Sequence, residues 1–161
     1  MTAEPSATYV LDANLLLRLA NKSDPARSMV GNAVISLLSS GVLMRTIPQT
    51  LFEFWVAATR PLEKNGLALS IADAESELLS FLKSFPLLPD DPTLVTHWRH
   101  LVVRHGVSGK QAHDARYVAA MQAHGVTHLL TMDADFRRYL AEGITIVDPA
   151  QVPLFATEHG E

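Results

Sequence analysis

The sequence predicts an α/β fold in which a parallel sheet lies between layers of helices. Short apolar runs alternate along the chain with longer segments of helical spacing. This alternation is typical of parallel strands joined by right-handed crossovers. The 161 residues, 48% hydrophobic and 19% charged, contain no repeat, low-complexity segment or long linker. They therefore predict a single domain over residues 1–161.

The first half of the chain contains two predicted strands and three predicted helices. In order, these are strand Thr8 to Leu11, helices Asn14 to Ala20 and about Pro25 to Ser39, strand Leu43 to Thr46 and helix Pro48 to Thr59. Proline suits the first turn of a helix, which favours starts at Pro25 and Pro48. Asp24 is the expected cap of the second helix, Gly41 follows its end, and Pro61 stops the third.

The second half continues the alternation with three helices and three strands. In order, these are helix Ser70 to Lys83, strand Phe85 to Leu88, helices Asp91 to about Arg104 and Ser108 to His124, and strands Val126 to Thr131 and Ile144 to Val147. Ser70 is the expected cap of its helix. Ser108 and Gln111 have the spacing of a capping box, and Gly125 ends that helix.

Composition excludes several classes of protein. The absence of cysteine excludes a disulfide scaffold, thiolate zinc sites, iron–sulfur clusters and cysteine nucleophiles, so any metal must bind oxygen or histidine. The net charge of -4 excludes a basic coat protein that binds nucleic acid through bulk charge. No apolar run approaches the ~20 residues of a membrane span. Residues 1–7 carry no secretory signal pattern, so we expect a cytoplasmic protein with no membrane contact.

Two acids directly follow predicted strands. Asp12 comes after TYVL and Asp133 after HLLTM. In open parallel sheets the ligand crevice lies beyond the carboxyl ends of the strands, where both acids belong. Each also has a structural interpretation, because Asp12 suits a helix cap and Asp133 a turn.

Glu53 lies in a segment whose apolar residues cover nearly the whole helix circumference. Neighbours such as Phe52 and Trp55 are expected in the core, and a helix of this kind is buried. A buried carboxylate needs a cation, because leaving it unpaired costs several kcal/mol. That cation is either a metal ion or an arginine such as Arg18 or Arg60.

Asp114 is expected in the second turn of its helix, beyond the reach of the helix dipole. It shares a helix face with Tyr117, Val118 and Met121, so it too is expected to point inward. The structural alternatives are an internal salt bridge and a hydrogen bond to the Tyr117 hydroxyl.

One shared cause explains all four acids more simply than four separate ones. Crowded carboxylates repel one another and tend to protonate, whereas a bound divalent cation keeps them ionised. An all-oxygen site fits Mg²⁺ or Mn²⁺. Without these four acids, the remaining acidic residues equal the lysines and arginines in number. A metal-loaded site therefore need not repel a phosphodiester.

Three segments resemble the PIN-domain family, particularly its toxin ribonucleases of the VapC type. They are VLDANLLLRL, IPQTLFEFWVAATRP and KQAHDARYVAAMQAHGVTHLLTMDADFRR, and the likeness spans about residues 8–148. The resemblance implies a PIN-like three-layer fold with a central parallel five-stranded sheet flanked by helices. It also implies a Mg²⁺- or Mn²⁺-dependent endoribonuclease, frequent homodimers and a cognate antitoxin that blocks the site.

Three acids match the family's motifs residue by residue. Asp12 matches the first acid and Asn14 the polar residue that commonly follows it two positions later. Glu53 in QTLFEF matches the second acid, and Asp114 in HDARYVA the third. The resemblance thus implies that these carboxylates bind the metal and are catalytic.

The fourth acid falls in TMDADF, where the family's motif varies. Asp133 is the favoured candidate, and Asp135 is the alternative or an additional outer ligand. Thr131 is the expected hydrogen-bonding neighbour. Four basic residues close to these motifs are candidate contacts to the RNA backbone, although exposed basic residues often serve only solvation. They are Lys110, Arg116, Arg137 and Arg138.

The leading hypothesis is metal-dependent hydrolysis of RNA by the toxin of a toxin–antitoxin pair. The alternatives are a housekeeping PIN nuclease without antitoxin, a non-catalytic PIN-like binding domain and a receiver-like phosphoacceptor domain. A receiver normally has an acid pair after the first strand, where this chain has Asp12 and Asn14, and a lysine near its fifth strand. An inhibitory partner would reach the acids with an arginine. Apolar residues of 15–34 are candidate partner contacts, although core packing is favoured for most.

Overall fold

The computed structural model describes residues 7–154 and contains a parallel sheet of four strands. The strands are β1 (Thr8–Leu11), β2 (Leu43–Arg45), β3 (His128–Leu130) and β4 (Thr145–Val147), in the order β2-β1-β3-β4. In this order the first strand is central, and β3 pairs with it from far along the chain.

Most of the N-terminal segment tested for a signal pattern, residues 1–6, lies outside the described residues.

Within residues 7–154, six α-helices and three 3₁₀ helices accompany the strands. They are α1 (Ala13–Ala20), α2 (Arg27–Ser39), α3 (Pro48–Thr59), η1 (Leu62–Lys64), α4 (Ile71–Ser84), α5 (Leu94–Arg104), α6 (Gln111–His124), η2 (Ala134–Glu142) and η3 (Pro149–Gln151). Proline begins α3, and the Ser70 hydroxyl caps α4 by accepting from the backbone N–H of Asp73. The predicted α/β class is confirmed.

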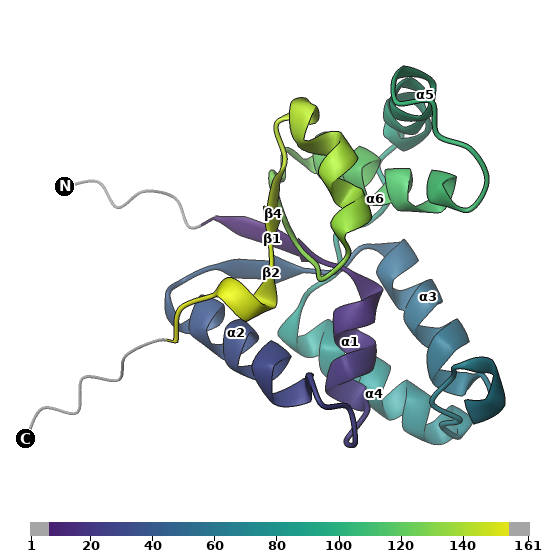
Figure 1. Ribbon diagram of the computed structural model, residues 1–161, viewed down its shortest axis with the longest axis vertical. Helices are drawn as coiled ribbons and strands as arrows, with labels where there is room; N and C mark the ends of the chain where they lie inside the picture. Colours follow the sequence, from purple (N-terminus) through teal and green to yellow (C-terminus); the bar gives the residue numbers. More distant parts are fainter. Residues whose placement is uncertain (1–6, 155–161) are drawn as a thin grey trace, which may run out of the picture.

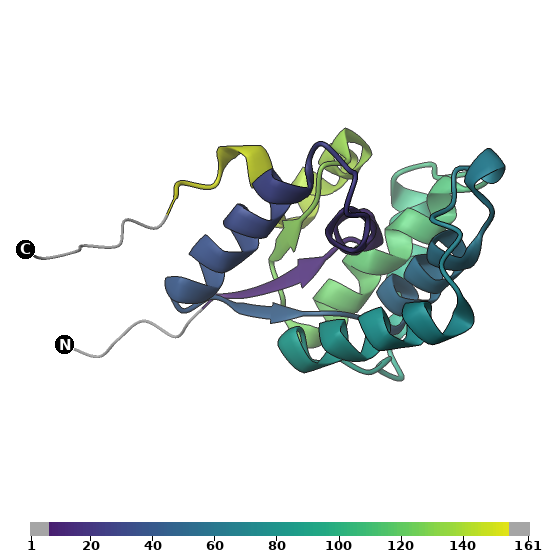
Figure 2. The ribbon, with the colours of Figure 1, turned by 90° about the horizontal axis from the view of Figure 1, so that it is seen from below.

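Alternate residues of the central strands face two separate cores. Val10 and Leu129 pack in a cluster with α5, α6 and η2, whereas Leu11 and Leu130 pack with α1, α2, α3 and α4. In Figure 1, α5 and α6 lie above the strands and α2 and α4 below them. Figure 2 shows α2 and the green helix α6 on opposite sides of the sheet. The arrangement is the predicted three-layer fold.

The predicted fifth strand is reduced to a single bridge. Leu87 pairs in parallel with Thr46, next to β2, through hydrogen bonds to the flanking residues. Pro86 lacks an N–H group and Pro89 follows Leu88, so the ladder cannot extend in either direction. The expected sheet of five strands is therefore wrong by this one element, which keeps its place at the edge of the sheet.

Three predicted helix starts are also wrong. The helix expected from Asp91 begins only at Leu94, as α5. Gly109 adopts φ +63°, which interrupts the helix expected from Ser108, and α6 begins at Gln111 without a side-chain cap. Asp114 consequently lies in the first turn of α6, not the second. Asp24 accepts from the backbone N–H of Ala26 at 2.8 Å, in a turn that precedes α2.

The apolar residues of the early helices belong mostly to the core. Leu15, Leu16 and Val30 are fully buried, and Leu19 and Met29 are half-buried against the same cluster. The favoured interpretation, core packing, is therefore right for this segment. Over residues 7–154, no helix combines the length and the apolar character needed to cross a membrane.

Candidate active site

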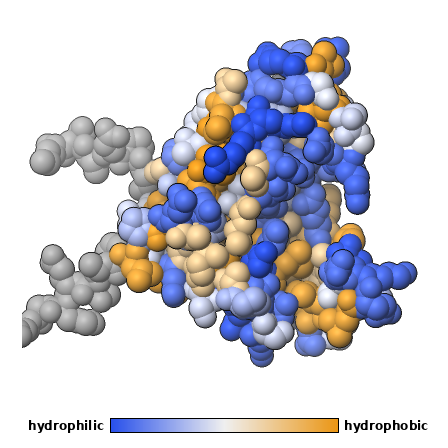
Figure 3. Space-filling view, viewed as in Figure 1, coloured by the Kyte–Doolittle hydropathy of each residue, from blue (hydrophilic) through white to orange (hydrophobic). Residues whose placement is uncertain are grey.

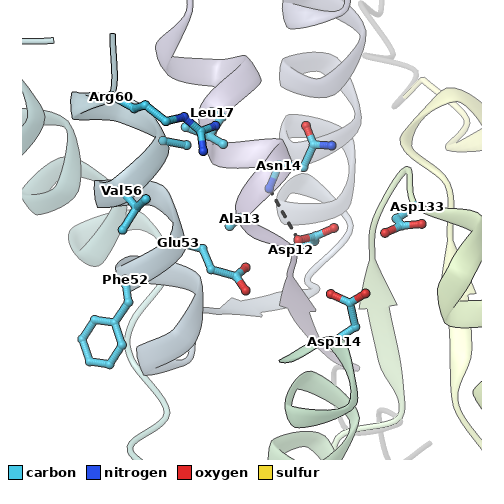
Figure 4. A pocket seen from close by; sticks show the side chains of 11 residues that line it. Asp12, Ala13, Asn14, Leu17, Phe52, Glu53, Val56, Arg60, Asp114 and Asp133 are labelled. Atoms are coloured by element: carbon cyan, nitrogen blue, oxygen red, sulfur yellow. Dashed lines mark hydrogen bonds between the residues drawn. The ribbon is translucent and has the colours of Figure 1, made fainter. Parts of the chain in front are cut away.

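The four predicted acids line one hollow of about 550 Å³ beyond the carboxyl ends of β1 and β3. The residues that line it are Asp12, Ala13, Asn14, Leu17, Phe52, Glu53, Val56, Ala57, Arg60, Asp114 and Asp133. Figure 4 shows the carboxylates of Asp12, Glu53, Asp114 and Asp133 turned toward a common space. The acids come from four different elements or their ends, so the topology itself brings them together.

Asp12 is held rigidly at the junction of β1 and α1. Its Oδ2 accepts from the Thr131 hydroxyl at 2.8 Å, and its Oδ1 accepts from the backbone N–H of Asn14 at 3.5 Å. The residue is only 8% exposed. Asp12 therefore caps α1, as its structural interpretation predicted, and also presents its carboxylate to the pocket.

Glu53 is positioned by two neutral donors. Its Oε1 accepts from Gln49 Nε2 at 2.8 Å, and its Oε2 accepts from the Tyr117 hydroxyl at 2.8 Å. Arg18, the first arginine considered as its partner, pairs with Asp24 at 3.2 Å. Over the described residues, neither arginine forms an ion pair with Glu53, so the structural ion pair expected as an alternative is absent.

Asp114 and Asp133 complete the acidic side of the pocket. The Tyr117 hydroxyl donates to Glu53, so the alternative hydrogen bond from Tyr117 to Asp114 does not form. The backbone N–H of Asp133 donates to the Thr131 hydroxyl at 3.0 Å, and its Oδ1 accepts from the backbone N–H of Asp135 at 2.9 Å. Asp133 thus makes the expected turn while it lines the pocket, whereas Asp135 is exposed and lies outside the lining.

The electrostatics of the pocket reflect a concentration of negative charge. Burial raises the pKa of Asp12 to about 6 against the hydrogen bonds from Thr131 and Asn14, and the charges of Glu53 and Asp133 add to the rise. Burial, followed by the charges of Asp133 and Glu53, raises the pKa of Asp114 to about 6. The acids therefore destabilise one another when no cation is near.

The chemistry of the donor set fits a hard divalent cation. Four carboxylates with no sulfur ligand are the oxygen donors that Mg²⁺ and Mn²⁺ prefer. As they stand, however, no three His, Asp or Glu side chains among residues 7–154 are placed close enough together to hold a metal ion directly. One-metal reach among Asp12, Glu53 and Asp114 is therefore not present in this arrangement.

The expectation that α3 is buried on nearly all sides is wrong. Phe54 is fully buried, but Phe52 is 62% exposed and Val56 is 59% exposed. α3 packs against α1 and α4 through only part of its circumference, which leaves the Phe52 side open. Figure 3 shows apolar surface, in orange, in the region of α1, α3 and α4 among hydrophilic side chains.

The four basic residues proposed for RNA contact do not line the pocket. Lys110 and Arg137 are exposed. Arg116 pairs with Asp90 at 2.7 Å, and Arg138 donates to Gln111 Oε1 at 2.9 Å. Of the arginines, the pocket is lined by Arg60, which the sequence suggested only as a partner for Glu53.

Two side chains that position the acids were missed as site residues. Gln49 bridges Glu53 and the backbone carbonyl of His113, with Nε2 distances of 2.8 and 2.6 Å. Burial and the charges of Asp12 and Glu53 keep the pKa of the Tyr117 hydroxyl well above its ordinary value, so it remains a donor. The i, i+4 spacing of Gln49 and Glu53 was the available signal. No sequence signal indicated the contact of Tyr117 with Glu53, because these residues are far apart in the chain.

Comparison with known proteins gives a family match over most of the chain. The profile of the PIN domain matches residues 9–141, which include all four acids. No curated protein matches the sequence.

Solved structures share the fold at low sequence identity. VapBC2 from Rickettsia felis, bound to a promoter DNA fragment, matches with a TM-score of 0.65 and 16% identity over 88% of this chain and 98% of that one. VapC20 from Mycobacterium tuberculosis, described as a sarcin-ricin loop cleaving toxin, matches with a TM-score of 0.64 and 18% identity over 90% and 99%. VapBC-1 from nontypeable Haemophilus influenzae matches with a TM-score of 0.64 and 14% identity over 89% and 99%.

Proposed function

This chain belongs to the PIN-domain family, and from that premise we propose that it is a divalent-metal-dependent endoribonuclease that acts as the toxin of a toxin–antitoxin pair. The observation that carries the proposal is the pocket in which Asp12, Glu53, Asp114 and Asp133 meet without a basic partner. A cluster of one buried and three half-buried acids costs stability, so its presence is best explained by a ligand that offsets the charge. Mg²⁺ or Mn²⁺ is that ligand in our proposal.

Each side chain has a separate role in this proposal. A bound cation supplies a water of lowered pKa and offsets charge on the phosphate and the leaving oxygen. Asp12, Glu53, Asp114 and Asp133 would hold the cation in part through water, since no three of them are placed to ligate it directly as they stand, and one carboxylate of the cluster would accept a proton from the attacking water. No protein nucleophile is required.

Neutral hydrogen-bond donors keep the acids in place. Thr131 orients Asp12, while Tyr117 and Gln49 fix the two oxygens of Glu53. Because these donors are uncharged, they restrict the carboxylates without neutralising them. The negative charge thus stays available for metal.

The decisive test is RNA cleavage by the purified chain. Cleavage in Mg²⁺ or Mn²⁺, its loss in chelator and its loss in Asp12→Asn support the proposal. A receiver-like domain would instead accept a phosphoryl group from a small donor and leave RNA intact. A non-catalytic binding domain would bind RNA but leave it uncut in every metal.

We also propose a cytoplasmic antitoxin partner that places an arginine among the acids. A guanidinium is permanently charged and binds carboxylates bidentately, so it would compete with both metal and RNA. Co-purification with the product of the adjacent small reading frame, followed by an RNase assay, tests this. No stable complex, or a complex that cleaves as fast as the free chain, would contradict the antitoxin and favour a housekeeping nuclease.

A homodimer is the expected form of the free chain. Sedimentation of the purified protein tests it, with a mass of twice 17.6 kDa as the expected outcome. A monomer at all accessible concentrations would contradict this expectation without affecting the proposed chemistry.

A further inference from the structure

The part of the pocket that lies away from the acids has a different composition. It is formed by apolar side chains and one arginine, which we call the α3 shelf: Leu17, Phe52, Val56, Ala57 and Arg60. Four of these residues belong to α3 or its C-terminal end, so they form one continuous border of the pocket. The metal chemistry proposed above assigns no role to this border.

Arg60 has no acidic partner. Over residues 7–154, the ion pairs involve Arg18, Arg104, His105 and Arg116, and none involves Arg60. Its Nη2 donates to the backbone carbonyl of Asn65 at 3.2 Å, and its Nε is buried without an acceptor. Arg60 therefore brings to the pocket a positive charge that no carboxylate neutralises, and an anionic ligand can bind its guanidinium.

Arg60 is not the counter-ion of the acidic cluster. The two oxygens of Glu53 are taken by Gln49 and Tyr117. In Figure 4, Arg60 lies beside Leu17, on the side of the pocket away from Asp114. One pocket therefore has a negative side for a cation and a positive side for an anion.

Phe52 and Val56 extend the shelf along α3 from Arg60. Their exposed fractions, 62% and 59%, are high for large apolar side chains that border a pocket. Phe52 precedes Arg60 by eight residues, a rise of about 12 Å along a helix. An aromatic ring and a cation along one border are the components with which proteins bind single-stranded nucleic acid.

We propose that the α3 shelf binds the single-stranded RNA that flanks the scissile phosphate, with Arg60 donating to a backbone phosphate and Phe52 stacking on a base. This inference rests on the proposed ribonuclease function and adds the path of the substrate across the pocket. A phosphate held at Arg60 fixes the strand relative to the four carboxylates. Both contacts are independent of base identity, so the shelf positions the strand and does not select its sequence.

The phosphate contact is tested by Arg60→Met, with Arg27→Met as the matched control. Arg27 is exposed, also donates to one backbone carbonyl, that of Leu19 at 3.0 Å, and lies outside the pocket lining. Binding of a labelled mixed-sequence single-stranded RNA is followed by anisotropy in the Asp12→Asn background, which keeps the RNA uncut. Arg60→Met should bind about tenfold more weakly, and its salt slope should fall by about 0.7, as expected for one lost contact to single-stranded RNA.

The stacking contact is tested by Phe52→Leu, with Ile35→Ala as the control for an exposed apolar side chain elsewhere. Ile35 is 62% exposed on α2, like Phe52 on α3. Phe52→Leu should weaken binding of single-stranded RNA by about fivefold and leave the salt slope unchanged. A duplex of the same sequence, whose bases are already stacked, should bind both variants alike.

The outcomes separate the shelf from the nuclease. If the Asp12→Asn chain binds RNA and adding Arg60→Met leaves its affinity and salt slope unchanged, the proposed role of the α3 shelf is wrong and the nuclease proposal stands. If Arg60→Met loses affinity only in proportion to a lower melting temperature, Arg60 is structural. If the variants lose only an antitoxin and not RNA, the shelf is a protein-binding surface and our inference is overturned. Failure of the unmodified chain to bind or cut any RNA would contradict the nuclease proposal itself.

Discussion

Two carboxylate sites in this chain are built in opposite ways. Glu142, at the end of η2, accepts from Arg104 at 2.7 and 2.9 Å and lies 2.8 Å from Nε2 of His105, with Gln122 at 3.3 Å. Its side chain is 8% exposed. Burial raises the pKa of Glu142, but hydrogen bonds from His105 and Arg104 outweigh this effect and hold the pKa below its ordinary value. This site carries its own cation, Arg104, and joins α5 to η2.

The acid pocket gathers more carboxylates and supplies none of them with a cation. The pKa of Asp12 and of Asp114 is raised to about 6. The same residue type is thus stabilised at one site and destabilised at the other, because the partners differ. Glu142 brings its own basic partner, whereas in the proposed function the pocket acids depend on a bound cation.

Activity should show the largest difference between the two sites. Asp12→Asn should reduce metal-dependent RNA cleavage by more than about a hundredfold, since it removes a ligand and not only a supporting contact. Glu142→Gln should stay within about threefold of the unmodified chain, because its contacts stabilise η2 away from the pocket. Single-turnover cleavage in Mg²⁺ and Mn²⁺ measures both. Equal losses in the two variants would contradict the distinction.

The pH dependence of stability should separate the sites next. In chelator, the free energy of unfolding of the unmodified chain should fall by roughly 2–3 kcal/mol more than that of Asp12→Asn between about pH 4 and pH 7. The pKa of Asp12 is about 6 in the folded chain against the ordinary 3.8, so the folded state binds more protons in this window and is destabilised as the carboxyl ionises. Urea unfolding at several pH values measures it.

Metal should remove most of that pH dependence. A bound divalent cation favours the ionised carboxylates, so saturating Mg²⁺ should stabilise the unmodified chain above about pH 6 and much less below about pH 4. The same titration on Asp12→Asn is the control. A pH profile that Mg²⁺ leaves unchanged would speak against a metal site.

Glu142→Gln should destabilise the chain by about 2 kcal/mol. Breaking a buried ion pair costs ~3–5 kcal/mol, and the cost is lower here because Arg104 is 64% exposed and can return to water. Because the pKa of Glu142 is lowered, this contribution is present at neutral pH and lost as the pH falls. Thermal melts at pH 7 measure the loss, and it should be independent of Mg²⁺.

Asp114→Asn should show the smallest effect, with the opposite sign. It removes the cost of burying the carboxylate and its repulsion from Asp133 and Glu53, so the variant should be more stable in chelator by about 1 kcal/mol, since the half-buried carboxyl is partly screened. For a chain of this length that raises the melting temperature by about 2–4 °C. Melts in chelator decide the sign, and a lower melting temperature would place Asp114 among ordinary structural acids.

The fold was predictable because local signals coincide with its elements. Pro48 and Ser70 begin helices where the sequence indicates, and the short apolar runs form β1 to β4. The predictions failed where backbone conformation or proline decides the outcome. Gly109 in the left-handed region moves the start of α6, and Pro86 reduces the fifth strand to one bridge.

The acids of the candidate site could be predicted because they interrupt apolar patterns, but their surroundings could not. That Tyr117 donates to Glu53, and that Arg60 has no acid, depends on side-chain geometry across elements. Phe52 illustrates the opposite error. Its apolar neighbours predicted burial, and only the packing of α3 against α1 and α4 reveals that its ring is exposed.

The central position of β1 determines when the site can form during synthesis. Asp12 leaves the ribosome early, but its partner Thr131 lies 119 residues later, and β3 pairs directly with β1. The entropic cost of closing this long loop comes before the contact can stabilise the fold, so the pocket forms only after nearly the whole chain has emerged. For the proposed ribonuclease, this order keeps the nascent chain inert beside the messenger RNA and ribosomal RNA that surround it during translation.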